Sequence, residues 1–146
     1  MSDWVRCQAA LGSAERLGPL QLAWIGDAVW ELHQRLRHGL RPGRSDALHK
    51  AVVDEVRADA QSAALAWLEQ QELLDDLELD WVRRGRNSAG RGPRRADAAV
   101  YGRATGFETM VGWLFLNNPD RLAELLDHLE VPDPIHNDFP HHEPSL

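Results

Sequence analysis

The sequence lacks several features that define common classes of protein. It has a single cysteine, Cys7, which excludes an intrachain disulfide framework and a cysteine-based zinc site. No apolar run approaches the roughly 20 residues that a membrane-spanning helix needs. The N-terminal segment also lacks the long apolar core of a signal peptide. We therefore expect a cytoplasmic protein.

Strand-like alternation and internal repeats are absent as well, whereas apolar residues recur at helical spacing along most of the chain. The sequence predicts an all-α fold with a single domain, because 146 residues, 43% of them hydrophobic, are enough to build one core. The patterns and turn signals predict helices over the ranges 3–11, 19–38, 46–70, 72–86, 97–117 and 120–130.

The C-terminal segment, residues 131–146, differs in composition from the rest of the chain. It has no lysine or arginine, and it holds half of the prolines, namely Pro132, Pro134, Pro140 and Pro144. Such a segment cannot bury enough apolar surface to fold. We therefore expect a disordered tail at 131–146, after a folded domain formed by residues 1–130.

Acidic residues are missing from one stretch, residues 83–95, although the whole chain has a net charge of −7. This stretch contains six arginines: Arg83, Arg84, Arg86, Arg91, Arg94 and Arg95. A local basic patch on an acidic body can still bind nucleic acid. Residues 87–95 also contain two glycines and a proline, which predicts a mobile loop. The alternative is a loop that only keeps the protein in solution.

One strongly apolar stretch, Leu22–Glu31, carries a carboxylate, Asp27, in its middle. Helical spacing predicts a core-facing stripe formed by Leu22, Ile25, Val29, Leu32 and Leu36. Asp27 points away from this stripe, toward a face that includes Trp24 and Trp30. A carboxylate on a helix that is apolar nearly all round needs a metal, a cation or hydrogen-bond donors. The alternative is an ordinary exposed aspartate beside surface tryptophans.

Glu108 repeats this pattern between Phe107 and Met110, inside the helix predicted over 97–117. Two such carboxylates on two central helices could meet around Mg²⁺, which takes one or two carboxylates together with waters and substrate phosphate. Mg²⁺ would activate a water and stabilise charge on a cleaved phosphodiester. Periodicity alone does not show that Asp27 and Glu108 converge.

Two segments resemble a known family. Leu22–Val29 resembles the signature helix of ribonuclease III, and Phe107–Leu116 resembles the second conserved helix of that family. The two segments come in the family's order and spacing. Between them, Arg83–Asn87 and Thr105–Glu108 resemble the short branch called Mini-ribonuclease III.

The resemblance implies a Mg²⁺-dependent endoribonuclease that cleaves double-stranded RNA, with Asp27 and Glu108 as catalytic metal ligands. It also implies a homodimer with two sites along one RNA-binding groove, and a role in maturing the 23S ribosomal RNA precursor. Six tryptophans in 146 residues are more than one small core needs, which independently suits an interface.

The chain departs from full-length ribonuclease III, which has four carboxylates per site. The other two matching positions are Ala23 and Thr105 here, as they are in the Mini branch. Thr105, three residues before Glu108, could hold a water or orient that carboxylate. Glu31, four residues after Asp27, could support it or be an ordinary solvated acid.

Nothing after residue 130 could form the family's double-stranded-RNA-binding domain, so we expect the catalytic domain itself to bind RNA. The candidate contacts are the six arginines and Lys50. A non-catalytic RNA-binding or ribosome-assembly module is the main alternative, since Ala23 and Thr105 could mark lost catalysis. Retention of both Asp27 and Glu108 favours the enzyme. A helical protein–protein adaptor would leave these acids and the arginines unexplained.

Overall fold

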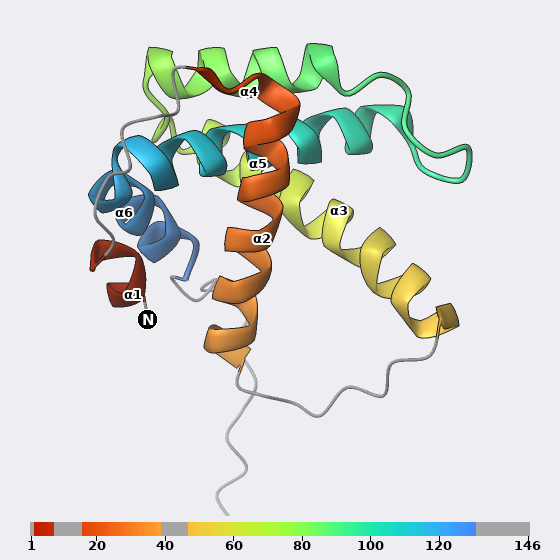
Figure 1. The fold of residues 1–146 in the computed structure, drawn as a ribbon, viewed down its shortest axis with the longest axis horizontal. Coiled ribbons are helices and arrows are strands. Elements are labelled where there is room, and N and C mark those ends of the chain that lie inside the picture. The colour runs from red at the N-terminus through yellow and green to blue at the C-terminus, as the bar shows by residue number, and fades with distance from the viewer. Residues whose placement is uncertain (1, 8–15, 39–46, 131–146) are drawn as a thin grey trace, which may run out of the picture.

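The computed structural model describes residues 2–7, 16–38 and 47–130, and for 38 and 47–56 it describes the backbone only. Within these residues the chain is helical and contains no strand, which confirms the predicted all-α class (Figure 1). The helices are α1 (Asp3–Arg6), α2 (Pro19–His38), α3 (Ala47–Gln70), α4 (Asp76–Ser88), α5 (Ala98–Asn117) and α6 (Pro119–Leu129). Among the described helices, none has the length and apolarity to cross a membrane.

Several helix ends lie where local signals predict them. Pro19 begins α2, as suits a residue with no N–H to donate. The Asp97 carboxylate caps α5 by accepting a hydrogen bond from the backbone N–H of Ala99 at 2.8 Å. At the start of α6, Asn118 accepts one from the N–H of Arg121 at 3.3 Å. These ends depend only on neighbouring residues, so the sequence predicts them well.

Two predicted helices have different bounds. α4 begins at Asp76 rather than 72, because Asp75 and Glu78 form a capping box. Asp75 Oδ1 accepts from the N–H of Glu78 at 2.8 Å, and Glu78 Oε1 accepts from the N–H of Asp75 at 2.9 Å. α4 then continues to Ser88, two residues past its predicted end. α1 ends at Arg6, well before the predicted residue 11.

The α4–α5 loop follows a defined path in this structure. The backbone at Gly92 has φ +77°, and the residue packs directly against the ring of Tyr101, where a side chain would overlap it. The predicted tail at 131–146 and the predicted loop at 39–46 lie outside the described residues.

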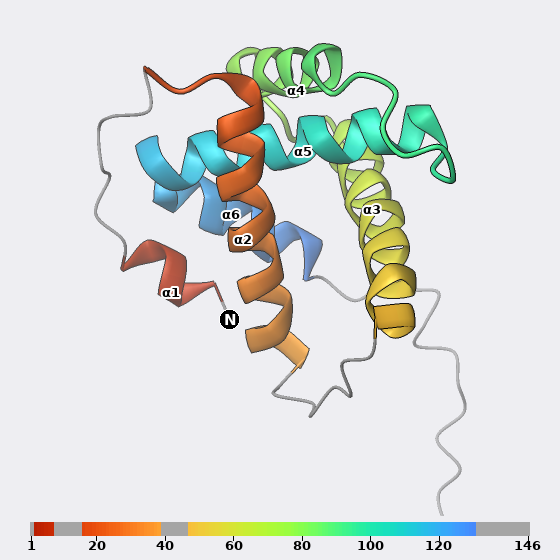
Figure 2. The same ribbon diagram turned by 45° about the vertical axis from the view of Figure 1, so that its right-hand side comes forward.

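Helix α5 is the centre of the fold and packs against α2, α3, α4 and α6. α4 and α5 run antiparallel, and α2 crosses in front of α5 in both views (Figure 1, Figure 2). The fully buried side chains include Phe107 and Leu114 of α5, with Leu65 of α3. Phe107 meets the ring of Trp30 edge to face, with centroids 5.1 Å apart. A helix in this position must be apolar on every side, which explains why Glu108 stands out.

Helix α2 turns a different face to the core from the stripe that helical spacing predicts. Leu32 and Leu36 of that stripe are exposed, whereas His33 is buried. The His33 ring accepts a hydrogen bond from Trp4 Nε1 at 3.3 Å, and its Nε2 lies 2.9 Å from Glu130 Oε1. The stripe prediction was therefore wrong for the second half of α2, because α1 and the end of α6 cover the His33 side.

Candidate active site

The α2–α5 crossing brings Asp27 and Glu108 together. Gly26 and Gly112 lie at the crossing, where a Cβ on Gly26 would overlap the carbonyl oxygen of Glu108 and one on Gly112 would overlap that of Leu22. Only glycine allows two helix backbones to approach so closely. Because Asp27 follows Gly26, its carboxyl group interacts directly with that of Glu108. This convergence is what periodicity could not show.

The environment of Glu108 is unusual for a carboxyl group. Burial is the largest cause that raises the pKa of Glu108, and together with the negative charge of Asp27 and a hydrogen bond with it brings this pKa to about 8. The guanidinium of Arg57 and the amide of Gln61 act in the opposite direction. At neutral pH the metal-free site therefore holds a proton that a bound cation would displace.

Arg57 of α3 links the acidic residues of α2. Its Nη1 lies 3.5 Å from Asp27 Oδ1 and donates a hydrogen bond to Glu31 Oε2 at 3.2 Å. Glu31 also accepts a hydrogen bond from Arg35 at 2.6 Å. The structure thus places Glu31 beside the site, where it helps to hold the guanidinium next to Asp27.

Gln61, one helical turn after Arg57, is the second contribution of α3. Its side chain is only 2% exposed, and its Nε2 makes no hydrogen bond of normal geometry. A buried amide donor whose hydrogen bond has poor geometry is weakly satisfied, and such groups often mark places where a water or a ligand binds. The amide also lies close enough to Glu108 to influence its pKa.

Arg57 and Gln61 were not predicted from the sequence, although the sequence carries a signal for one of them. Gln61 lies at helical spacing with the buried Leu65 and Leu68. A polar residue on an apolar stripe is the same signal that singled out Asp27. For Arg57 no comparable signal exists, since an arginine on a helix surface is ordinary.

Thr105 and Ala23 are the positions that the resemblance matches to further carboxylates of full-length ribonuclease III. The Thr105 hydroxyl donates its proton to the carbonyl of Tyr101 at 2.9 Å, so that proton is directed along its own helix. Ala23 is buried. Within the described residues no group of three or more acidic, histidine or cysteine side chains could hold a metal.

The two carboxylates nevertheless fit Mg²⁺. This ion binds oxygen ligands, keeps several waters and needs only one or two protein carboxylates. Burial and the charge of Asp27 raise the pKa of Glu108 despite the guanidinium of Arg57, so a bound cation would help to keep both carboxyl groups ionised. Asp27 and Glu108 are therefore the residues that could hold a metal.

The candidate RNA-binding arginines lie away from this pair. Arg83, Arg84 and Arg86 are exposed on α4, and the other three follow in the α4–α5 loop: Arg91, Arg94 and Arg95. Glu108 is eleven residues beyond Asp97, so it lies about 16 Å along α5 from the end of that loop. Lys50 is in α3, but its side chain lies outside the described part. The arginines therefore form a separate surface.

The sequence model of the Ribonuclease III domain matches residues 20–119, which include both carboxylates and the α2–α5 crossing. The chain belongs to the ribonuclease III family. Membership of the ribonuclease III family also makes the chain an endoribonuclease, which confirms the predicted family and enzyme class.

Relatives of this ribonuclease III chain that carry the name Mini-ribonuclease 3 match most of its length. The protein from Synechococcus sp. is 48% identical over 119 residues, which cover 82% of this chain and 85% of the relative. Those from Gloeobacter violaceus and Synechocystis sp. are 46% and 44% identical over 121 residues, covering 83% of each chain. These matches confirm the resemblance to the Mini-ribonuclease III branch.

The raised pKa of Glu108 predicts how stability depends on pH. The native state keeps a proton on Glu108 up to about pH 8, whereas the unfolded chain loses it near the ordinary value of 4.5. The metal-free protein should therefore lose stability as pH rises from 5 to 8, by at most about 1.4 kcal/mol per pH unit. Thermal melts in EDTA across this range measure the effect.

The control for this prediction is Glu108→Gln, which cannot titrate. The melting temperature of this variant should therefore fall less with rising pH than that of the wild type. The curves of melting temperature against pH for the two proteins should diverge toward alkaline pH. Parallel curves for the two proteins would contradict a raised pKa at Glu108.

Proposed function

We propose that this ribonuclease III chain is a Mg²⁺-dependent endoribonuclease that cleaves double-stranded RNA, with Asp27 and Glu108 as the metal ligands. The observation that carries the proposal is the close α2–α5 crossing, which brings the two carboxyl groups into contact. Two buried acidic side chains whose charges repel each other do not stabilise a fold, so their contact favours a functional role. The likeness to chains named Mini-ribonuclease 3 supports the same function.

Each residue of the site has a part in this proposal. When bound, Mg²⁺ supplies a Lewis acid that polarises the phosphodiester and lowers the pKa of a water. Asp27 and Glu108 would hold the ion, and the proton that they share would pass to solvent on metal binding. Arg57 keeps a positive charge at the site, suited to the negative charge that grows on the phosphate. Gln61 offers a buried amide donor beside the Glu108 carboxyl group.

The exposed arginines support duplex RNA as the substrate. Arginine neutralises phosphates and fits A-form RNA by shape rather than by sequence. The proposed contacts are Arg83, Arg84, Arg86, Arg91, Arg94, Arg95 and Lys50. The proposed catalytic domain is residues 1–130. By resemblance to the Mini-ribonuclease III branch, we extend the proposal to maturation of the 23S ribosomal RNA precursor in the cytoplasm.

Incubation of the purified protein with a duplex RNA, with Mg²⁺ or with EDTA, tests this function. We expect cleavage of the duplex with Mg²⁺, none with EDTA, and little cleavage of either strand alone. Binding of the duplex without cleavage in Mg²⁺ would instead support a non-catalytic RNA-binding or ribosome-assembly module.

The exposed side of α2 supports a homodimer as the active form. Four large apolar side chains on this helix are exposed at multiples of four residues: Leu20, Trp24, Leu32 and Leu36. Trp24 is 81% exposed, and the stripe continues past Ala28, which is exposed too. A contiguous apolar stripe of this kind marks an interaction surface. Because α2 also carries Asp27, a second copy docked there would bring two sites together on one assembly.

Replacement of Trp24 by Ser should convert the dimer to a monomer, because a large aromatic anchor is removed from the centre of the stripe. Light scattering after size-exclusion chromatography measures the mass directly. Trp67→Ser on α3 is the matched control, since this tryptophan is also exposed (37%) but lies off the stripe. Equal masses for the wild type and Trp24→Ser would contradict the proposed interface.

A further inference from the structure

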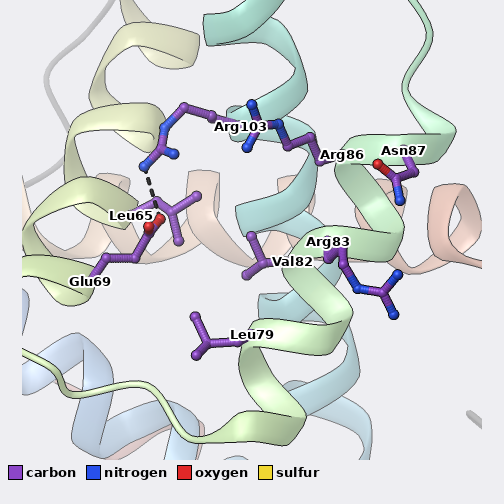
Figure 3. A pocket seen from close by; sticks show the side chains of 8 residues that line it. All are labelled: Leu65, Glu69, Leu79, Val82, Arg83, Arg86, Asn87 and Arg103. Atoms are coloured by element: carbon purple, nitrogen blue, oxygen red, sulfur yellow. Dashed lines mark hydrogen bonds and ion pairs between the residues drawn. The ribbon is translucent and has the colours of Figure 1, made fainter.

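A second concave site lies between α3, α4 and α5, apart from the two carboxylates (Figure 3). Its volume is about 400 Å³, within the usual range for ligand pockets. Leu65 and Val82 are buried and form its apolar base. Three arginines line it as well: Arg83 and Arg86 from α4, and Arg103 from α5. Asp27, Glu108 and the α4–α5 loop do not line this pocket.

The charges of the pocket favour an anion. Its charged lining consists of three guanidinium groups and one carboxylate, Glu69, and because Arg83 is paired with Asp80 next to the pocket, a formal charge of +1 remains. Arg103 Nη2 donates a hydrogen bond to Glu69 Oε1 at 2.8 Å, as Figure 3 shows. A guanidinium has five N–H donors, so the remaining donors of Arg103 stay available. Arg86 makes no ion pair within the described part of the chain.

The pocket lies on the same side of α3 as the carboxylate site. Gln61, which interacts with Glu108, is followed at intervals of four residues by Leu65 and Glu69, both of which line the pocket. Four-residue spacing keeps side chains on one face of a helix. Gln61 and Glu69 are eight residues apart, or about 12 Å along the axis of α3. Protein domains contact duplex RNA over about 16 base pairs, which is much longer than 12 Å, so one bound A-form duplex can reach both sites.

We propose that this pocket binds a backbone phosphate of the same RNA whose strand meets Asp27 and Glu108, with Arg103 as the positioning residue. The proposal rests on the proposed function. A guanidinium binds a phosphate through two parallel hydrogen bonds, which fixes orientation as well as distance. Glu69 holds the Arg103 side chain in place before RNA arrives, so less conformational freedom is lost on binding.

Two substitutions that remove the same ion pair test this proposal, because the proposal predicts different effects of the two on the affinity for duplex RNA. In EDTA, where the RNA stays intact, Arg103→Gln should weaken duplex binding roughly tenfold. It should also reduce the slope of log affinity against log salt by somewhat under one, as for one lost phosphate contact. Glu69→Gln should bind RNA as tightly as the wild type or more tightly, since it removes a negative charge while its amide oxygen can still accept the hydrogen bond from Arg103.

A purely structural role for the Arg103–Glu69 pair predicts that both variants weaken binding alike, with an unchanged salt slope, and that result would overturn the proposal. Arg103→Lys should recover part of the slope, because the charge is kept. Arg16→Gln is the matched control, since Arg16 is exposed and does not line the pocket. It should change affinity far less than Arg103→Gln.

The failure of this proposal can be told apart from failure of the proposed function. A wild type that cleaves the duplex while Arg103→Gln keeps its affinity and slope would overturn the pocket alone. A wild type that neither binds nor cleaves duplex RNA would overturn both. A third outcome would assign the pocket to free anions instead of RNA. In that case inorganic phosphate would shift the NMR resonance of the Arg103 side chain, while Arg103→Gln would leave the slope of log RNA affinity against log salt unchanged.

Discussion

Asp27→Asn is expected to reduce the rate of duplex RNA cleavage below a few per cent of the wild-type rate. The substitution keeps the shape of the side chain and removes only the charge that a metal needs. Folding should not suffer, since the loss of the Asp27 charge also removes a repulsion that Glu108 experiences. RNA binding in EDTA should stay nearly intact, because the arginines lie elsewhere. Single-turnover cleavage and thermal melts measure the two effects separately.

Glu108→Gln should have the same consequence, and the two substitutions should not add. If both carboxylates hold one ion, either loss removes the ion, and the double variant should be hardly slower than each single variant. Asp59→Asn is the matched control, because Asp59 is an exposed acid on the neighbouring helix α3. Multiplicative losses in the double variant would mean that Asp27 and Glu108 do not share a metal.

Gly26→Ala is expected to destabilise the protein by roughly 3 kcal/mol and to abolish cleavage. The added methyl group would overlap the backbone carbonyl of Glu108, and a helix backbone cannot move aside as a flexible side chain can. α2 and α5 would have to separate, which also separates the two carboxylates. Circular dichroism melts and a cleavage assay in Mg²⁺ together measure this outcome.

Gly102→Ala provides the control for this prediction. Gly102 is also buried and lies in α5, but a Cβ there would sit 3.5 Å from Arg86 Cγ, which is an ordinary contact. Because alanine favours a helix more than glycine does, this variant should be as stable as the wild type or up to about 1 kcal/mol more stable. If Gly26→Ala had the same melting temperature as Gly102→Ala, the α2–α5 crossing would tolerate a side chain, and the prediction would be wrong.

Much of the local structure could be predicted from the sequence. The bounds of α2 agree with the predicted range, and the Asp97 cap and the Asn118–Pro119 break mark the ends of α5 and the start of α6. Such signals involve residues within a few positions of one another, so they act before the chain has a tertiary structure. The start of α4 was predicted wrongly because the Asp75–Glu78 capping box was overlooked, although it too is a local signal.

Only part of the candidate site could be predicted from the sequence, because some of its residues are recognisable within one segment and others are not. Asp27 and Glu108 stand out because each is a charge within an apolar helix, and that can be read from a single segment. Arg57 and Gln61 lie on α3, and their relation to Glu108 depends on how α3 packs against α5. No residue near Arg57 in the sequence indicates that packing.

The sequence by itself determined the helices, their caps and the two anomalous carboxylates, because these depend on propensity and periodicity within one segment. Only the tertiary structure decided which face of α2 is buried and that Asp27 meets Glu108. The reason is that a helix presents several possible faces, and its neighbours choose among them. Here Gly26 and Gly112 allow α2 and α5 to touch at one point. That contact sets the position of the carboxylates and leaves Trp24 exposed.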